Sequence, residues 1–315
     1  MVSDLYIYHN TYFGTIQGLY YPDEALEYEI GGDNVKHPEK WRDTVDPFDL
    51  PFDHFTLKEV IGYPHAGNDV FQVRGIFQNT AVDAYIKVAR QRGADIKREI
   101  DTISALNWGL LPEIIDYDER KEMYVVTLAK EGERLSTILG NNETRDSMDY
   151  LYEYGQTLAR LHQIRGVFPD VNDRRFFHMP PIEQLVGNGL GFVYDYLTNC
   201  KPQEINRCFC HGDFHYANIL WKDKHISGIL DFELAGIGNK EFDIAWALIL
   251  RPGQRFLKTE EEISLFMQGY FSYGFCNLEY VRYYMVLIYA YFMEIGGDIP
   301  GYQEYVRNTL KALTV

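Results

Sequence analysis

The spacing of apolar positions divides the chain into a strand-rich part and a helical part. Between residues 54 and 130, short apolar runs separated by turn signals predict mainly strands. From about residue 133 onward, helical periodicity dominates, as in the apolar stripe of Ser147–Gln163. The expected elements of the first part are the strands Phe55–Ile61, Val70–Phe77, Ala81–Ala89, Ile114–Tyr117 and Met123–Thr127 and a helix near Ala94–Leu106.

This order predicts an α+β fold with two lobes: a small antiparallel-sheet lobe at residues 54–130 and a larger helical lobe at residues 131–315. Residues 1–53 are acidic and rich in tyrosine, with turn signals at Tyr21-Pro22, Gly31-Gly32 and Asp46-Pro47. We expect them to form a small β-rich extension packed on the next lobe.

The net charge of −16 argues against a surface that binds nucleic acid. Half of it lies outside the two predicted lobes, because residues 1–53 carry 11 acidic and three basic side chains. The charge therefore does not identify a cationic substrate.

The sequence predicts a cytoplasmic protein without a membrane partner. Its N-terminus lacks the basic and apolar regions of a signal peptide. The longest apolar runs, Ala245–Leu250 and Met285–Ala290, are much shorter than the roughly 18 residues that span a bilayer. Nothing in the sequence indicates the oligomeric state.

Four cysteines are too few for a disulfide framework in a chain of 315 residues. Cys208 and Cys210 are separated by one residue, which matches neither the CxxC redox pattern nor the common zinc-ligand spacing. We expect buried or incidental thiols.

Two polar motifs flank a predicted hairpin. The first is His-Gly-Asp-Phe-His-Tyr-Ala-Asn at 211–218, and the second is Leu-Asp-Phe-Glu at 230–233. A turn at Lys224-His225 places Asn218 opposite Asp231, within one residue.

Amide and carboxylate oxygens that converge in this way suit Mg²⁺. Glu233 is a further candidate ligand, because residues two apart on a strand share a face. Asp213, on the loop that enters the hairpin, can orient an acceptor hydroxyl and take its proton. The combination predicts phosphoryl transfer.

These motifs resemble the aminoglycoside phosphotransferases and their relatives, including choline and ethanolamine kinases. Ala235–Gly238, Phe242–Ala245 and Leu158–His162 extend the resemblance, which covers residues 54–250. It implies a protein-kinase-like fold in which Asp213 is catalytic, Asn218 and Asp231 hold Mg²⁺, and His211 braces the loop. Residues 1–53 resemble nothing in this family.

The strand-rich lobe offers groups for the nucleotide. Lys87 lies in an apolar strand, and Glu99 lies on the apolar face of the next predicted helix, which resembles the kinase ion pair that orients phosphates. The loop at 62–70, with Gly67 and Asn68, is a candidate phosphate loop, although it reads equally well as a plain hairpin turn. The backbone of Thr127, Leu128 and Ala129 is a candidate for binding the base of ATP or GTP.

Acceptor contacts are less specific. The carboxylates suited to ammonium groups are Asp195, Glu233, Glu241 and Glu294. The aromatics at Tyr270, Phe271, Tyr273, Tyr283, Tyr284, Tyr289, Tyr291 and Phe292 can cage a quaternary amine, but their helical spacing is more typical of core packing. Aminoglycoside-like, amino-alcohol and sugar acceptors all remain open.

The predicted function is transfer of a phosphoryl group to a small-molecule hydroxyl. A kinase acting on a protein is the first alternative, but about ten residues between Glu233 and Asp243 leave little room for a peptide-docking segment. A non-catalytic nucleotide-binding module is the second, and it has no need of Asp213.

Overall fold

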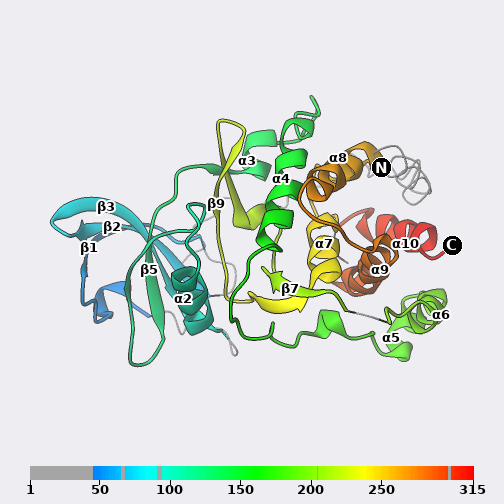
Figure 1. The fold of residues 1–315 in the computed structure, drawn as a ribbon, viewed down its shortest axis with the longest axis horizontal. Coiled ribbons are helices and arrows are strands. Elements are labelled where there is room, and N and C mark those ends of the chain that lie inside the picture. Colours follow the sequence, from blue (N-terminus) through cyan, green and yellow to red (C-terminus); the bar gives the residue numbers. More distant parts are fainter. Residues whose placement is uncertain (1–44, 65–67, 91–93, 204, 297–298) are drawn as a thin grey trace. The chain divides into compact units, whose positions relative to one another are not determined.

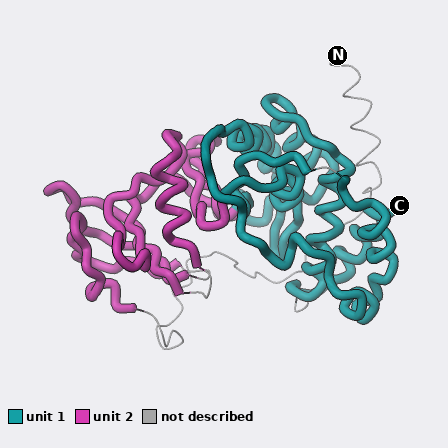
Figure 2. The backbone as a smooth tube through the Cα atoms, turned by 60° about the horizontal axis from the view of Figure 1, so that its bottom comes forward, with its two compact units in different colours: residues 1–28, 138–216, 236–315 teal, residues 29–137, 217–235 magenta. Residues whose placement is uncertain are grey.

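The computed structural model describes residues 45–315 except 65–67, 91–93, 204 and 297–298. The described chain forms two compact units (Figure 2). Unit 1 contains residues 138–216 and 236–315, and unit 2 contains residues 45–137 and 217–235. Within the described residues, no helix has the length and apolar character needed to cross a bilayer. Most of the predicted N-terminal extension, residues 1–44, lies outside the described residues.

Unit 2 is built on a five-stranded antiparallel sheet in the order β1-β2-β3-β5-β4 (Figure 1). The predicted strands are confirmed, with ends that shift by one residue at most. Their bounds are Phe55–Gly62 (β1), Asp69–Phe77 (β2), Thr80–Val88 (β3), Ile114–Tyr117 (β4) and Tyr124–Leu128 (β5).

Helix α2 (Ile96–Ala105) begins at Asp95, whose carboxylate caps it by accepting the N–H of Arg98. Its apolar face packs through Ile96 and Ile100 against Val125 of the sheet. This packing brings Glu99, on the same face, toward the sheet and buries it.

The described end of the predicted extension, residues 45–53, is not a strand. It contains the short 3₁₀ helix η2 (Pro47–Asp49), capped by the side chain of Asp46. Val45, Leu50 and Phe52 pack against the core of the five-stranded sheet. A proline after the capping aspartate favours this turn over a strand.

Unit 2 also contains the hairpin of β8 (Ile219–Lys222) and β9 (His225–Ile229), which joins β6 (Glu133–Arg134) in a three-stranded sheet. The predicted turn was wrong by one residue, because Asp223 and Lys224 form it, with φ of 51° and 66°. Positive φ at both central residues gives the twist that suits a two-residue hairpin. A register shift follows between Leu220 and Trp221.

Unit 1 is mainly helical, as the periodicity predicts, and contains one small sheet of β7 (Arg207–Cys210) and β10 (Gly236–Asn239). Its central helix α9 (Leu278–Ile295) is buried along most of its length, which confirms core packing for most of its aromatic residues. The longer helices besides α9 are α4 (Met148–Leu161), α7 (Lys240–Leu248), α8 (Glu260–Phe271) and α10 (Tyr302–Leu313). The short ones are η3 (Arg175–Phe177), α5 (Ile182–Gly187) and α6 (Gly191–Asn199). Two further short helices, α3 (Leu135–Leu139) and η4 (Tyr216–Asn218), lie where the chain passes between the units.

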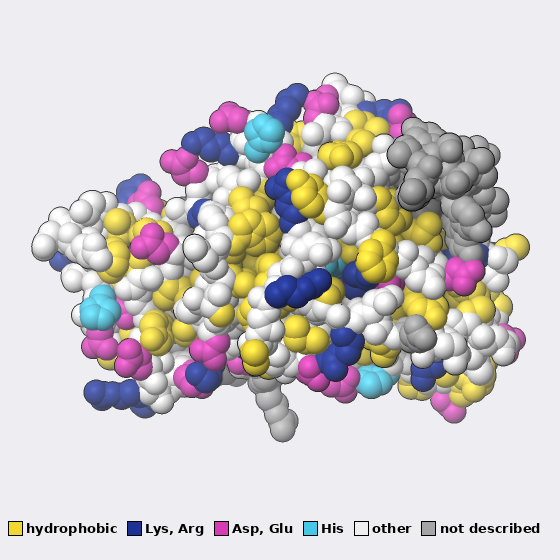
Figure 3. Space-filling view, viewed as in Figure 1, with side chains coloured by type: hydrophobic (Ala, Val, Ile, Leu, Met, Phe, Trp, Pro, Cys, Tyr) yellow, Lys and Arg dark blue, Asp and Glu magenta, His cyan; other side chains and the backbone are white. Residues whose placement is uncertain are grey.

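Basic and acidic side chains are interspersed on the face drawn in Figure 3, so the described residues of this face form no extended basic patch. The absence of a nucleic-acid partner stays a prediction.

Helices α4 and α8 cross closely because glycines occupy their contact. A Cβ atom on Gly155 would lie 1.9 Å from the carbonyl oxygen of Phe266, and one on Gly269 would lie 1.8 Å from that of Tyr152. Both clashes are with backbone, so the helices themselves would have to move apart.

We predict that Gly155→Ala and Gly269→Ala each lower the free energy of unfolding by about 3 kcal/mol, the upper range for overpacking a core. Gly187→Ala is the matched control, since a Cβ there meets nothing within 4 Å. It should be neutral or stabilising by up to about 1 kcal/mol, the gain of alanine over glycine in a helix. Urea denaturation of the three variants tests this, and equal losses at all three positions would contradict it.

Candidate active site

Four charged side chains meet in unit 2. Lys87 Nζ lies 2.7 Å from Glu99 Oε2, 2.6 Å from Asp231 Oδ1 and 3.0 Å from Glu233 Oε2. Lys87 comes from β3, Glu99 from α2, and the two other acids from the segment that follows β9. The contact expected between Lys87 and Glu99 is present, and two of the predicted metal ligands join it.

The cluster holds more negative than positive charge. One ammonium and three carboxylates leave a formal balance of −2. Burial lowers the pKa of Lys87, but the three carboxylates more than compensate, and this pKa lies well above its ordinary value. Burial raises the pKa of Glu99, and the charge of Lys87 offsets only part of that rise.

The three carboxylates suit a small hard cation. One oxygen from each of Glu99, Asp231 and Glu233 lies within 4.8 Å of the others. Oxygen donors with excess negative charge are what Mg²⁺ requires, and it needs only one or two protein carboxylates when phosphate oxygens complete its shell. Asp231 and Glu233, two of the three predicted ligands, are therefore donors that fit Mg²⁺.

The register of the hairpin places Asn218 within one residue of its predicted partner Asp231, as the prediction allowed. Ile219 pairs with Ile229, and the N–H of Leu230 donates to the carbonyl oxygen of Asn218 at 2.8 Å. Asn218 therefore faces Leu230, one residue before Asp231. The displaced turn moves the pairing by two residues, and the register shift between Leu220 and Trp221 restores one of them. Asp231 has φ of 68°, a left-handed conformation that aspartate tolerates better than most residues.

Asn68 connects the loop after β1 to this cluster. Its side-chain amide donates to Glu233 Oε2 at 2.6 Å, and its side-chain oxygen accepts the N–H of Arg90 at 3.2 Å. Asn68 is buried, so these bonds hold it in place. The neighbouring Gly67 lies outside the described residues, and its phosphate-loop role stays a prediction.

Part of the backbone of residues 127–129, which we expect to bind the base, is already hydrogen-bonded within the five-stranded sheet. The N–H of Leu128 donates to the backbone carbonyl oxygen of Glu113 at 2.9 Å, and the N–H of Ala129 donates to that of Asp83 at 3.0 Å. Thr127 is paired in β5. These two N–H groups are therefore not available to a nucleotide, because the sheet uses them.

In unit 1, the loop after β7 is held by buried polar contacts. The two carboxylate oxygens of Asp243 accept the N–H groups of His211 at 2.9 Å and of Gly212 at 3.0 Å. Arg174 donates to the carbonyl oxygen of Gly212 at 2.6 Å. The ring of His211 accepts the N–H of Asp213 at 3.3 Å, a bond consistent with the bracing role that we expect for it.

These contacts position the Asp213 carboxylate. Its Oδ1 accepts the indole N–H of Trp246 at 2.6 Å, and its Oδ2 lies 3.5 Å from His215 Nε2. Burial acts to raise the pKa of Asp213, but His215, Arg251 and Arg174 together bring it well below its usual range. The carboxylate is therefore ionised throughout the physiological range of pH.

Sequence reasoning did not assign roles to Asp243, Trp246, Arg174 or Arg251. For Asp243 a signal exists, since it is an acid within the otherwise mostly apolar run 242–248 of α7, where a buried charge must have partners. For Arg174 and Arg251 no local signal distinguishes them from surface arginines.

The predicted acceptor carboxylates are dispersed. Glu241 is fully buried and accepts hydrogen bonds from Asn206 at 2.8 Å and from the N–H of Asn277 at 3.2 Å, so it cannot serve as an exposed handle, and this expectation was wrong. Asp195 is exposed on α6. Glu294 is exposed near the end of α9, where it accepts from Asn188 at 3.4 Å. Glu233 belongs to the lysine cluster of unit 2.

Comparison with known proteins agrees with these features. Residues 66–276 match the family described as "Phosphotransferase enzyme family". An aminoglycoside 3'-phosphotransferase of Enterococcus faecalis is 26% identical over 212 residues, which are 58% of this chain and 76% of that protein.

Among solved structures, the streptomycin–ATP complex of APH(2'')-IIa superposes with a TM-score of 0.53 at 15% identity, covering 75% of this chain and 84% of that one. A choline/ethanolamine kinase family protein from Mesorhizobium loti gives 0.52 at 16% identity, covering 85% and 88%. These structures share the fold, and the family match spans more than half of the chain. The chain therefore belongs to the phosphotransferase enzyme family and is a phosphotransferase that acts on a hydroxyl group.

Proposed function

We propose that this protein transfers the γ-phosphate of ATP or GTP to a hydroxyl group of a small molecule, with Asp213 as the catalytic residue. The observation that carries the proposal is the cluster in which the Lys87 ammonium contacts three carboxylates. A bound metal would supply the positive charge that the carboxylates lack, and Lys87 would supply an ammonium to the phosphate oxygens of a nucleotide. The APH(2'')-IIa structure holds ATP, which supports a nucleotide donor.

In this proposal Asp231 and Asn218 hold Mg²⁺, with Glu233 at or near the metal. When bound, Mg²⁺ neutralises charge on the transferring phosphoryl group. Lys87 is kept protonated by its neighbours, so that its ammonium is available to phosphate oxygens. Glu99 holds the lysine in place from α2.

Asp213 acts on the acceptor. Its low pKa makes it a weak base in the ground state but keeps it ionised, and an ionised carboxylate accepts hydrogen bonds, so its first task is to orient the hydroxyl. The proton moves to it late, as the bond to phosphorus forms, which suits the loose transition state of phosphoryl transfer. Trp246 fixes the direction of the carboxylate through its indole N–H.

The groups near Asp213 favour an acceptor that is not polycationic. The positive charges of Arg174 and Arg251 both lower the pKa of Asp213. Their guanidinium groups lie 5.0 and 5.1 Å from the ring centre of Trp246. Their two charges cancel those of Asp213 and Asp243, which leaves no excess negative charge to attract ammonium groups. We infer an acceptor whose binding does not depend on several ammonium groups.

A protein substrate has less support. The segment between Glu233 and α7 consists of a turn and the four residues of β10, which pairs with β7. It offers no long loop on which a peptide could dock.

The proposal is tested by a coupled assay of nucleotide turnover with Mg²⁺, using ATP and GTP separately. The acceptors are aminoglycosides, choline, ethanolamine, methylthioribose, homoserine and macrolides. We expect one acceptor class to stimulate turnover. Asp213→Ala should reduce kcat at least about 100-fold with nearly unchanged nucleotide affinity, since positioned proton acceptors contribute 10²–10⁴-fold.

The control is Glu304→Ala, an exposed acid on α10 that should leave kcat unchanged. If Asp213→Ala retains more than about a tenth of the wild-type kcat, its catalytic role is excluded.

Asp231→Asn should weaken nucleotide binding in the presence of Mg²⁺ and leave metal-free binding nearly unchanged, because it removes a ligand charge. Asparagine tolerates the same positive φ, so the backbone is retained. Asp223→Asn, in the exposed turn of the same hairpin, is the matched control. Calorimetric titrations with and without Mg²⁺ measure the difference, and identical Mg²⁺ dependence in the two variants would rule out Asp231 as a ligand.

The charge of the acceptor gives a further prediction. Among acceptors with a comparable hydroxyl, kcat/KM should not rise with added ammonium groups, and it should not fall as salt is raised. Electrostatic attraction of a polycation would be screened by salt. A polyamine acceptor with the highest kcat/KM, declining steeply with ionic strength, would refute the inference.

A further inference from the structure

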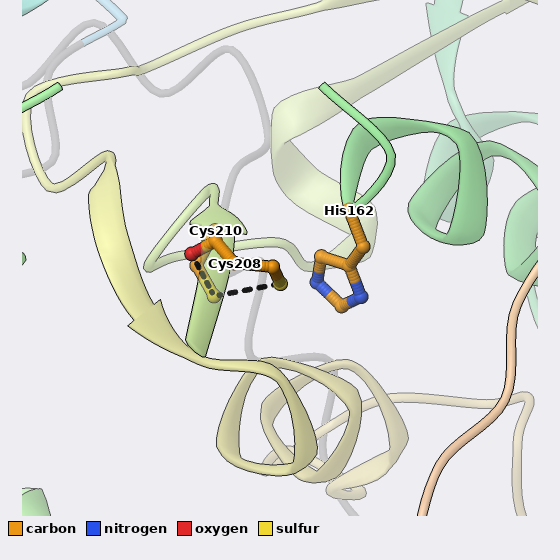
Figure 4. Close-up of side chains that lie close together, drawn as sticks. All are labelled: His162, Cys208 and Cys210. Atoms are coloured by element: carbon orange, nitrogen blue, oxygen red, sulfur yellow. Dashed lines mark hydrogen bonds between the residues drawn. The ribbon is translucent and has the colours of Figure 1, made fainter. Parts of the chain in front are cut away.

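A second cluster of ligand-type side chains lies in unit 1, behind the loop that carries Asp213. His162 at the end of α4 meets Cys208 and Cys210 of β7, and their three side chains point toward one another (Figure 4). One ligand atom from each lies within 4.8 Å of the others. Residues two apart on a strand share a face, so the single-residue spacing of the cysteines directs both thiols toward the histidine.

The distance between the thiols has a chemical meaning. The two Sγ atoms are 3.9 Å apart, much longer than the roughly 2.05 Å of a disulfide. Two thiolates that bind one tetrahedral Zn²⁺ at about 2.3 Å are separated by about 3.8 Å. The observed spacing, at which the two thiols share a hydrogen bond, is also the spacing that two thiolate ligands of one metal require.

The hydrogen bonds of His162 determine which of its ring nitrogens can bind a metal. Its Nε2 lies 3.2 Å from Asp243 Oδ2, and its Nδ1 lies 2.8 Å from the hydroxyl of Tyr270. Asp243 already accepts two backbone N–H groups, and a carboxylate has no proton to give, so Nε2 carries the ring proton. Nδ1 then has the lone pair. A carboxylate behind the imidazole is the usual support of a metal-bound histidine.

The two thiols differ in acidity. The hydrogen bond with Cys210 lowers the pKa of Cys208, whereas burial raises the pKa of Cys210. Cys208 is the more accessible of the two and is the better first ligand for an incoming metal.

We propose that His162 Nδ1 and the thiolates of Cys208 and Cys210 form a three-ligand site for Zn²⁺ or another soft cation. Binding releases the two thiol protons, and the hydroxyl of Tyr270 leaves Nδ1. Nitrogen and sulfur donors select Zn²⁺ or Cu(I) over Mg²⁺, which distinguishes this site from the carboxylates of unit 2.

The site is connected to the proposed catalytic loop. The same Asp243 carboxylate binds the ring of His162 and the backbone N–H groups of His211 and Gly212. A cation bound to the imidazole makes the ring N–H a stronger hydrogen-bond donor to Asp243. The Asp243 carboxylate in turn positions the loop through the N–H groups of His211 and Gly212. Zn²⁺ should therefore change kcat more than nucleotide affinity, an expectation that rests on the proposed function.

The test uses Co²⁺ as a spectroscopic probe on the reduced full-length protein, with excess Mg²⁺ present to occupy carboxylate sites. We expect one Co²⁺ per chain with the near-ultraviolet band of a cobalt–thiolate bond, and displacement of Co²⁺ by Zn²⁺. Cys208→Ser should lower the affinity more than about 100-fold, beyond the cost of losing an outer-shell partner. Cys200→Ser, an exposed cysteine at the end of α6, is the matched control.

Absence of the thiolate band, or a band that survives in Cys208→Ser, overturns the site. Mass spectrometry of the protein before reduction adds a second check, because a native Cys208–Cys210 disulfide would show a redox pair instead. Circular dichroism confirms that the serine variants fold. The Co²⁺ spectrum does not depend on turnover, so a protein that binds Co²⁺ but uses no acceptor refutes only the proposed function.

Discussion

The buried carboxylate of Asp243 is the interaction on which unit 1 depends. It is 1% exposed and accepts hydrogen bonds from His211, Gly212 and His162. A buried charge costs several kcal/mol unless such bonds compensate it. All three donors must therefore stay in place, and they come from two different elements, the loop after β7 and the end of α4. The position of Asp213 follows from this requirement, because it is the next residue along the loop.

Unit 2 has the opposite electrostatic design. Around Lys87 the acidic groups outnumber the ammonium, so the cluster is compact but not neutral. The burial of Glu99 and the left-handed backbone of Asp231 each cost free energy. Other interactions in the folded unit offset this cost before any ligand binds. Charges held in place before a ligand arrives need little reorganisation when it binds, and such preorganisation is the main source of catalysis in phosphoryl transfer.

One continuous motif is divided between the two units. Asp213 lies in the part of the chain that belongs to unit 1, whereas Asn218 begins the hairpin that belongs to unit 2. Solved structures share this fold at 15% or 16% identity, and a shared fold does not by itself select the acceptor. In the proposed function, acceptor choice rests with groups of unit 1 near Asp213, among them His215, Arg174 and Arg251.

The sequence by itself determined the strands of the five-stranded sheet, the helices α2 and α4, the phosphotransferase motifs and the pair of Lys87 and Glu99. Each of these depends on local periodicity or on short spacings, which the alternation of apolar positions reports directly. Only the tertiary structure decided the one-residue shift of the hairpin, the burial of Glu241, and the meeting of His162 with the cysteine pair. The burial of Glu241 and the meeting of His162 with the cysteines join residues far apart in the chain, and their geometry is set by how helices and strands pack. The hairpin shift is local, but it depends on a strand irregularity that alternation of apolar positions does not report.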